Sequence, residues 1–145
     1  MTQEVVLVRH GETELSRDCR HTGRTDVPLT DVGREQAKAL ASCLSTWEFA
    51  KVLTSPLGRA MDTCRLAGHG NRAELRDDRV IAEVASVDGD VALFAHGHVL
   101  RVPAARWVGL APELGRSFAL GTATISVLGY ERETRVILRW DQPCG

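Results

Sequence analysis

The chain has 145 residues, which is the length of one domain, because domains commonly contain about 100–150 residues. Hydrophobic residues make up 43% of it and charged residues 26%, a composition that argues against a disordered chain, a fibre or a membrane-spanning protein. The formal net charge is −1, so no global basic field attracts nucleic acid or an anionic bilayer. We therefore expect a single soluble domain over residues 1–145, with neither nucleic acid nor a membrane as a partner.

The N-terminal residues and the cysteines predict a cytoplasmic protein. Before the first apolar run, the sequence lacks the basic segment and the long apolar stretch of a secretory signal. Cys19, Cys43, Cys64 and Cys144 lie far apart in the sequence and form no C-x-x-C pair. Because thiols stay reduced in the cytoplasm, we expect ordinary thiols at these positions, with neither a disulfide framework nor a zinc site.

Strand and helix patterns alternate in the first half of the chain. Residues 5–8 form a continuous apolar run, which predicts a strand buried on both faces. Thr30 is a suitable N-cap for a helix whose apolar residues recur at helical spacing as far as Leu44. A short strand at 51–54 and a helix at 57–66, which a serine–proline pair opens, continue the pattern.

The second half repeats this alternation and ends in two antiparallel strands. The expected segments are a weak strand at 73–76, a helix at 79–87, a buried strand at 90–95, a helix at 99–108, and strands at 122–130 and 135–140. Pro103 falls inside the last helix, so we expect a kink or a late start there. The pattern predicts an α/β fold: a three-layer α/β/α sandwich with a mostly parallel, doubly wound sheet and helices on both faces.

Two of the expected parallel strands are followed by histidine. His10 comes directly after the first strand, and His96 comes after the strand at 90–95. A single histidine at a strand end is more often structural than catalytic. The carboxyl ends of parallel strands lie at one edge of the sheet, however, and ligands bind at that edge. We therefore expect both histidines in one pocket.

Two arginines accompany these histidines. Arg9 precedes His10, and Arg59 lies in the first turn of the helix at 57–66, where the helix N-terminus also favours anions. Guanidinium groups offer planar, permanently charged donors that suit a phosphoryl group. A solvated helix face is the alternative for Arg59, but together with both histidines the pattern favours an anion pocket.

Three motifs carry a resemblance to a known family. The strings RHGET at 9–13, SPLGRA at 55–60 and HGH at 96–98 resemble, in this order, the phosphoglycerate-mutase-like branch of the histidine phosphatase superfamily. The string HTGRTDVPLT at 21–30 is similar to the substrate-side loop of that branch's acid phosphatases and sugar-bisphosphate phosphatases. The resemblance covers nearly the whole chain and implies the same α/β/α fold.

The resemblance implies a role for each of the four central residues. His10 is the expected nucleophile, which forms a phosphohistidine that water later hydrolyses, so its imidazole must be neutral and held in one tautomer. Arg9, Arg59 and His96 are expected to surround the transferring group and stabilise its equatorial oxygens. Because these charges replace a metal ion and the sequence has no clustered Asp or Cys ligands, we expect neither a metal nor a cofactor.

A second set of positions matches the rim of the family's site. Ser16, Thr22 and Gly23 correspond to residues that line the phosphate and substrate entrance, and Gly97 offers a backbone donor. Ser16 stands where the mutases usually have asparagine, and Leu15 stands where the branch usually has tryptophan, which favours a phosphatase over a mutase. Loop capping is the alternative for Ser16 and Thr22.

Four further residues are less favoured as functional groups. His21 and Arg24 lie in the substrate-side loop, but we do not assign them to the site. His69 and His98 are expected to be structural or exposed to solvent.

The segment after the strand at 73–76 departs from the family's pattern. The branch normally has an excursion there that carries the glutamate protonating the leaving oxygen. Here Asp78 runs directly into Arg79 and the expected helix, without turn residues. Either the protein lacks the excursion or the sequence omits it, and the abrupt junction near 78–79 favours omission. Asp77, Asp78 and Glu83 are the nearest carboxylates, but they suit solvated surface better, so the general acid is left unassigned.

The leading hypothesis is a metal-independent phosphatase of the acid phosphatase type that hydrolyses small phosphorylated metabolites through a phosphohistidine on His10. A phosphoglycerate mutase is one alternative, and it would need a closed site that excludes water. A short protein-phosphohistidine phosphatase is another, but the loop at 21–30 argues against it. A non-catalytic module that binds phosphorylated ligands is least favoured, because both histidines and both arginines are present. The natural substrate and the oligomeric state are left open.

Overall fold

The computed structural model describes residues 3–18, 26–75, 84 and 86–144. Within this part of the chain, six strands form one mixed sheet in the order β3-β2-β4-β1-β5-β6. The strands are β1 (Val5–Arg9), β2 (Lys51–Thr54), β3 (Ala73–Leu75), β4 (Val91–Ala95), β5 (Thr124–Glu131) and β6 (Thr134–Pro143).

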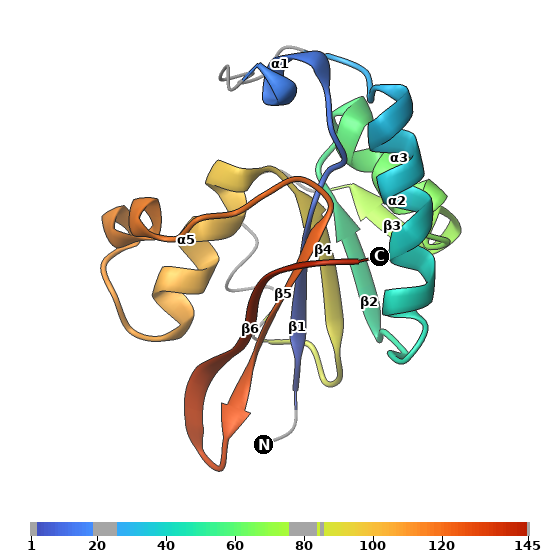
Figure 1. The fold of residues 1–145 in the computed structure, drawn as a ribbon. Coiled ribbons are helices and arrows are strands. Elements are labelled where there is room, and N and C mark those ends of the chain that lie inside the picture. The colour runs from blue at the N-terminus through green and yellow to red at the C-terminus, as the bar shows by residue number, and fades with distance from the viewer. Residues whose placement is uncertain (1–2, 19–25, 76–83, 85, 145) are drawn as a thin grey trace.

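Helices cover both faces of this sheet. They are α1 (Glu14–Arg17), α2 (Asp31–Leu44), α3 (Gly58–Leu66) and α5 (Gly97–Trp107), with short 3-10 helices at Gly70–Arg72 and Pro112–Ser117. Figure 1 shows α2 and α3 on one side of the sheet and α5 on the other. Alternate residues of β1 supply the two cores: Val5 and Leu7 pack in the cluster with α5, and Val6 and Val8 in the cluster with α2 and α3. This arrangement confirms the predicted three-layer sandwich.

The central strands are parallel, as predicted. Strand β1 pairs with β4 so that Arg9 lies opposite Ala95, and β2 pairs in parallel with both β4 and β3. Strands β5 and β6 form the expected antiparallel pair and extend the sheet beside β1. Because β1 and β4 are parallel neighbours in register, the residues that follow them emerge at the same edge.

Helix α2 begins as its sequence predicts and supports the loop after β1. The hydroxyl of Thr30 accepts a hydrogen bond from the N–H of Gly33 (3.0 Å) as the N-cap, and Leu40 and Leu44 are buried in the core. A Cβ atom at Gly33 would lie 2.1 Å from the carbonyl oxygen of Glu12. Only glycine therefore allows this close approach between α2 and the loop.

Helix α5 begins earlier than predicted. It starts at Gly97, directly after His96, and Leu100 donates to the His96 carbonyl (2.9 Å) in the first turn. Pro103, which has no N–H to donate, lies inside the helix, so the expected late start is wrong and the kink expected as the alternative stays a prediction. The buried residues Leu100 and Trp107 lie on either side of Pro103, and their burial favours a continuous helix despite the missing donor.

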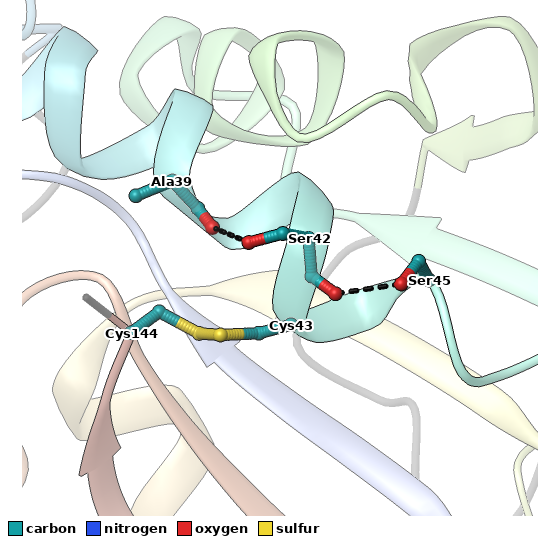
Figure 2. Close-up of a disulfide and its surroundings, with 5 residues drawn as sticks. All are labelled: Ala39, Ser42, Cys43, Ser45 and Cys144. Atoms are coloured by element: carbon teal, nitrogen blue, oxygen red, sulfur yellow. Dashed lines mark hydrogen bonds between the residues drawn. A yellow bond between two sulfur atoms is a disulfide. The ribbon is translucent and has the colours of Figure 1, made fainter.

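A disulfide corrects the prediction that the cysteines are ordinary thiols. Cys43 of α2 and Cys144 after β6 are bonded, with their Cα atoms 6.2 Å apart. Figure 2 shows how this bond ties the end of the chain to α2. The two residues are 101 positions apart, and only the return of β6 across the sheet brings them together.

Cys64 differs from this pair because it is a free thiol in the core. Burial raises its pKa to about 12, so it is an unreactive core residue, as predicted.

Cys19 and most of the helix expected at 79–87 lie outside the described residues. In the part of the chain that the structure describes, no helix is long and apolar enough to cross a membrane.

Candidate active site

His10 and His96 face each other at the carboxyl edge of the sheet. The N–H of His10 donates to the carbonyl of Ala95 (3.1 Å), which continues the β1–β4 pairing one residue beyond the end of β1. His10 is 4% exposed, and the centroids of the two imidazole rings are 5.4 Å apart. The structure thus brings together the two histidines that the strand pattern placed at one edge.

The His10 side chain is held in one tautomer. Its Nδ1 atom lies 2.7 Å from the carbonyl oxygen of Gly11. A carbonyl oxygen can only accept, so Nδ1 carries the proton and Nε2 keeps its lone pair. A free Nε2 lone pair is the feature that a nucleophilic imidazole requires.

The surroundings of His10 also keep it uncharged. Burial is the largest cause that lowers the pKa of His10 from 6.5 to about 3, and the nearby charges of Arg9, His96 and Arg59 act in the same direction. The hydrogen bond to the Gly11 carbonyl acts against them and raises this pKa. His10 is therefore neutral near pH 7.

Backbone contacts from several elements fix the loop that carries His10. The N–H of Ala123, just before β5, is shared between the carbonyls of Arg9 (3.1 Å) and His10 (3.0 Å). The N–H of Gly11 donates to Oγ1 of Thr63 on α3 (3.0 Å). A Cβ atom on Gly11 would lie 2.4 Å from the carbonyl oxygen of Gly33. The loop is thus held between α2, α3 and the start of β5.

Ser55 at the end of β2 contacts His96. Its hydroxyl oxygen lies 2.7 Å from Nε2 of His96 and also accepts from the N–H of Leu57 (3.3 Å). Strands β2 and β4 are neighbours, so the residues that follow them meet at the same edge. This contact orients the His96 ring.

Arg9 lies between the strand edge and the first turn of α5. Its guanidinium donates to the carbonyl of Leu120. Its Nε atom is buried, and a Cβ atom on Gly97 would lie only 3.2 Å from it. Burial, then the charge of Arg101, lower the pKa of Arg9, whereas Asp141 raises it. Gly97 thus leaves the space that the Arg9 side chain occupies.

Arg59 is 2% exposed, so it does not lie on a solvated helix face. It occupies the first turn of α3, and its charge is close enough to His10 to lower the pKa of that imidazole. Burial lowers the pKa of Arg59 itself, and Asp26 raises it. The Asp26 carboxylate also accepts from the N–H of Gly58 (3.0 Å) at the start of α3.

Ser16 lies in the first turn of the short helix α1, which was not predicted from the sequence, and forms a capping box with the N-cap residue Thr13. Its N–H donates to the hydroxyl of Thr13 (3.1 Å), and its own hydroxyl accepts from the N–H of Thr13 (2.8 Å). This is the capping arrangement considered as the alternative for Ser16. A contact between Ser16 and substrate stays a prediction.

Of the other residues singled out in the sequence, some are described by the structure and the rest lie outside the described residues. Gly97 is the first residue of α5, where a backbone N–H has no acceptor inside the helix and can donate to a bound anion. His98 is exposed, and His69 packs against the ring of Phe49, as expected. The positions outside the described residues are Thr22, Gly23, His21, Arg24, Asp77, Asp78, Glu83 and the junction at 78–79.

The site's charge comes from side chains. Two guanidinium groups and two imidazoles converge on the edge where β1 and β4 end. Within the described ranges, no group of three or more His, Cys, Asp or Glu side chains could hold a metal ion. The arrangement suits an anion, and the neutral Nε2 of His10 suits transfer of that anion's phosphorus.

Sequence reasoning missed Thr63 and did not assign Ser55 a contact. Thr63 lies four residues after Arg59, so both occupy the same face of α3, and both are buried. The available signal in the sequence was a threonine four residues after Arg59, which helical spacing places on the same face as that site residue. Ser55 lay inside a quoted motif, but its contact with His96 depends on the strand order.

Comparisons with known proteins agree with this geometry. The family model described as histidine phosphatase superfamily (branch 1) matches residues 5–88 and 76–143. An acid phosphatase of Mycobacterium tuberculosis is 31% identical over 179 positions, which cover 90% of this chain and 88% of that protein. Because 90% of 145 residues is about 131, about 48 of those 179 positions have no counterpart in this chain.

Two further relatives show the range of the family. A 2,3-bisphosphoglycerate-dependent phosphoglycerate mutase of Gloeobacter violaceus is 47% identical over 62 residues, which cover 43% of this chain and 28% of that protein. The solved structure of an open reading frame of Mycobacterium tuberculosis superposes with a TM-score of 0.81 and 27% identity, covering 99% of each chain. Because the family model matches most of the chain and the acid phosphatase is 31% identical over 90% of it, this protein belongs to branch 1 of the histidine phosphatase superfamily.

Proposed function

We propose that this protein is a metal-independent phosphatase that hydrolyses small phosphorylated metabolites through a phosphohistidine on His10. The observation that carries the proposal is the state of His10: it is buried and neutral, its Nδ1–H is bound to the Gly11 carbonyl, and its Nε2 keeps its lone pair. The guanidinium groups of Arg9 and Arg59 supply positive charge near His10, and the ring of His96 lies beside it.

The reaction has two displacement steps. In the first, Nε2 of His10 attacks phosphorus, the P–N bond forms, and the bond from phosphorus to the ester oxygen breaks with its electron pair on the leaving oxygen. The leaving oxygen takes up a proton from solvent, and the water of the second step returns one proton to solvent. Arg9, Arg59 and His96 stabilise the equatorial oxygens of the transferring group. In the second step, water attacks phosphorus, the P–N bond breaks, and phosphate leaves while His10 returns to its neutral form.

Hydrolysis is favoured over a mutase reaction by two observations. The match to the acid phosphatase spans 90% of this chain, whereas the match to the mutase spans 43%. Ser16 also stands where the mutases usually have asparagine, and Leu15 stands where the branch usually has tryptophan. A mutase would have to retain a bisphosphate and exclude water between the two transfers.

The test is phosphate release from p-nitrophenyl phosphate and from 3-phosphoglycerate, with and without EDTA. We expect release that EDTA does not reduce, and that His10→Ala abolishes. His98→Ala is the matched control, because it removes an exposed histidine two residues from His96. Absence of release from every ester would favour a non-catalytic module. Isomerisation of phosphoglycerate faster than its hydrolysis would identify a mutase, and activity restored by one metal ion after chelation would contradict metal independence.

A further inference from the structure

Thr63 is fully buried on α3 and bonds to the residue next to the nucleophile. Its Oγ1 donates to the carbonyl of Arg59 (2.7 Å) and accepts from the N–H of Gly11 (3.0 Å). A hydroxyl has one proton, so the bond to Arg59 commits that proton and leaves a lone pair for the Gly11 N–H. Thr63 therefore acts as an acceptor in a fixed direction.

Gly11 is the residue whose conformation sets the His10 tautomer. Its carbonyl accepts from Nδ1 of His10 (2.7 Å), and the following N–H, that of Glu12, donates to Oε1 of Gln36 (2.9 Å). Glycine has the widest range of backbone dihedrals, so Gly11 does not hold its own carbonyl in place. Thr63 anchors the peptide before it, and Gln36 anchors the peptide after it.

We propose that Thr63 is a positioning residue for His10: by holding the Gly11 N–H, it keeps the Gly11 carbonyl on Nδ1–H and leaves the Nε2 lone pair of His10 free. The effect on rate rests on the proposed function, but the effect on the tautomer does not. Thr63 acts through Gly11, without any contact to substrate.

Loss of the hydroxyl has a definite consequence. Without it, the Gly11 N–H is a buried donor with no acceptor from Thr63, and the wide dihedral range of glycine allows Gly11 to rotate toward another acceptor. Rotation moves the carbonyl away from Nδ1. The tautomer with a proton on Nε2 then becomes accessible, and that tautomer cannot attack phosphorus.

The experiment compares Thr63→Val, which keeps the side-chain shape but has no hydroxyl, with Thr63→Ser, which keeps the hydroxyl. Cys64→Ala is the matched control, because it alters a buried free thiol at the next position of α3. The first readout is the ¹⁵N chemical shifts of the His10 ring, assigned through their loss in His10→Gln. The second is the single-turnover rate of phosphoenzyme formation from p-nitrophenyl phosphate, together with KM.

We expect Nδ1–H in the wild type, Thr63→Ser and Cys64→Ala, and a substantial share of Nε2–H in Thr63→Val. The phosphoenzyme should form on the order of 10²-fold more slowly in Thr63→Val, with KM changed much less, and Thr63→Ser should restore the rate. If Thr63→Val does not fold, Gln36→Met, which removes the other anchor from a half-buried position, should shift the tautomer in the same direction.

An unchanged Nδ1–H tautomer in whichever of these variants folds would overturn the inference and leave the proposed function intact. A wild-type protein that shows the Nδ1–H tautomer but releases no phosphate would overturn the proposed function and leave the tautomer claim to be decided by the variants. Equal loss of rate in Thr63→Val and Cys64→Ala would reduce Thr63 to a structural role and would also overturn the inference.

Discussion

The hydroxyl of Ser55 and Nε2 of His96 lie 2.7 Å apart, which joins the residues that follow two neighbouring parallel strands. The Ser55 hydroxyl also accepts a hydrogen bond from the N–H of Leu57 at the start of α3. One serine therefore links the start of the helix that carries Arg59 to the second histidine of the site.

Ser55→Ala should slow phosphoryl transfer about 10–100-fold, the range found when a group that orients a metal-binding histidine is removed. The reason is that the His96 ring loses the contact that sets its orientation. The measurement is kcat for p-nitrophenyl phosphate, with Ser45→Ala as the control, since Ser45 is exposed and donates to the carbonyl of Ser42 at the end of α2. An unchanged kcat in Ser55→Ala would contradict this role.

Folding stability should decrease as the pH is lowered, because His10 stays neutral in the folded chain. The pKa of His10 is about 3 when folded, against 6.5 as its ordinary value, so below pH 6.5 the unfolded chain binds a proton that the folded chain does not. As the pH is lowered from 6.5 to about 3, the free energy of unfolding should therefore decrease by about 1.4 kcal/mol per pH unit from this group alone. His10→Gln should lack this slope. Urea unfolding of both proteins at several pH values checks it, and parallel curves would contradict it.

The part of the site at the carboxyl ends of the parallel strands was predictable from sequence. Apolar runs ending at Arg9 and at Ala95 predict buried parallel strands, and this alone places His10 beside His96. The N-cap at Thr30 is equally local, since the hydroxyl bonds to an N–H three residues later. Such features depend on neighbouring residues and on one general rule about parallel sheets.

Contacts between distant segments were not predictable in this way. The Cys43–Cys144 bond depends on how far β6 runs back across the sheet, and the Thr63–Gly11 bond depends on where α3 packs. The early start of α5 was missed because Pro103 weighs against a helix locally, whereas burial of Leu100 and Trp107 against the sheet favours it. In each case tertiary packing decided the outcome.

Reduction of the disulfide should lower the free energy of unfolding by about 2–4 kcal/mol, because the bond closes a long loop that the reduced unfolded chain leaves open. The loop spans 101 positions. Urea unfolding with and without dithiothreitol measures the change. Cys43→Ser is the control, and its stability should not depend on the reductant. Equal stability of oxidised and reduced wild type would contradict the prediction.

The rate should depend on the leaving group in a way that reveals the general acid. General acids contribute about 10²–10⁴-fold, and the contribution grows with the pKa of the leaving alcohol. A chain confirmed by mass to consist of these 145 residues should therefore cleave aryl phosphates far faster than alkyl phosphates. Values of kcat/KM over a series of esters provide the test. A flat dependence would indicate a relocated acid, with Asp77, Asp78 and Glu83 as the carboxylates to substitute first.

Trapping of the phosphoenzyme tests the central claim most directly. Rapid acid-free quenching of the protein during turnover of p-nitrophenyl phosphate, followed by peptide mapping, should find one phosphoryl group on His10, stable in base and labile in acid. His10→Ala should carry no label and release no phosphate. A label on another residue, or turnover by His10→Ala at the wild-type rate, would contradict nucleophilic catalysis by His10.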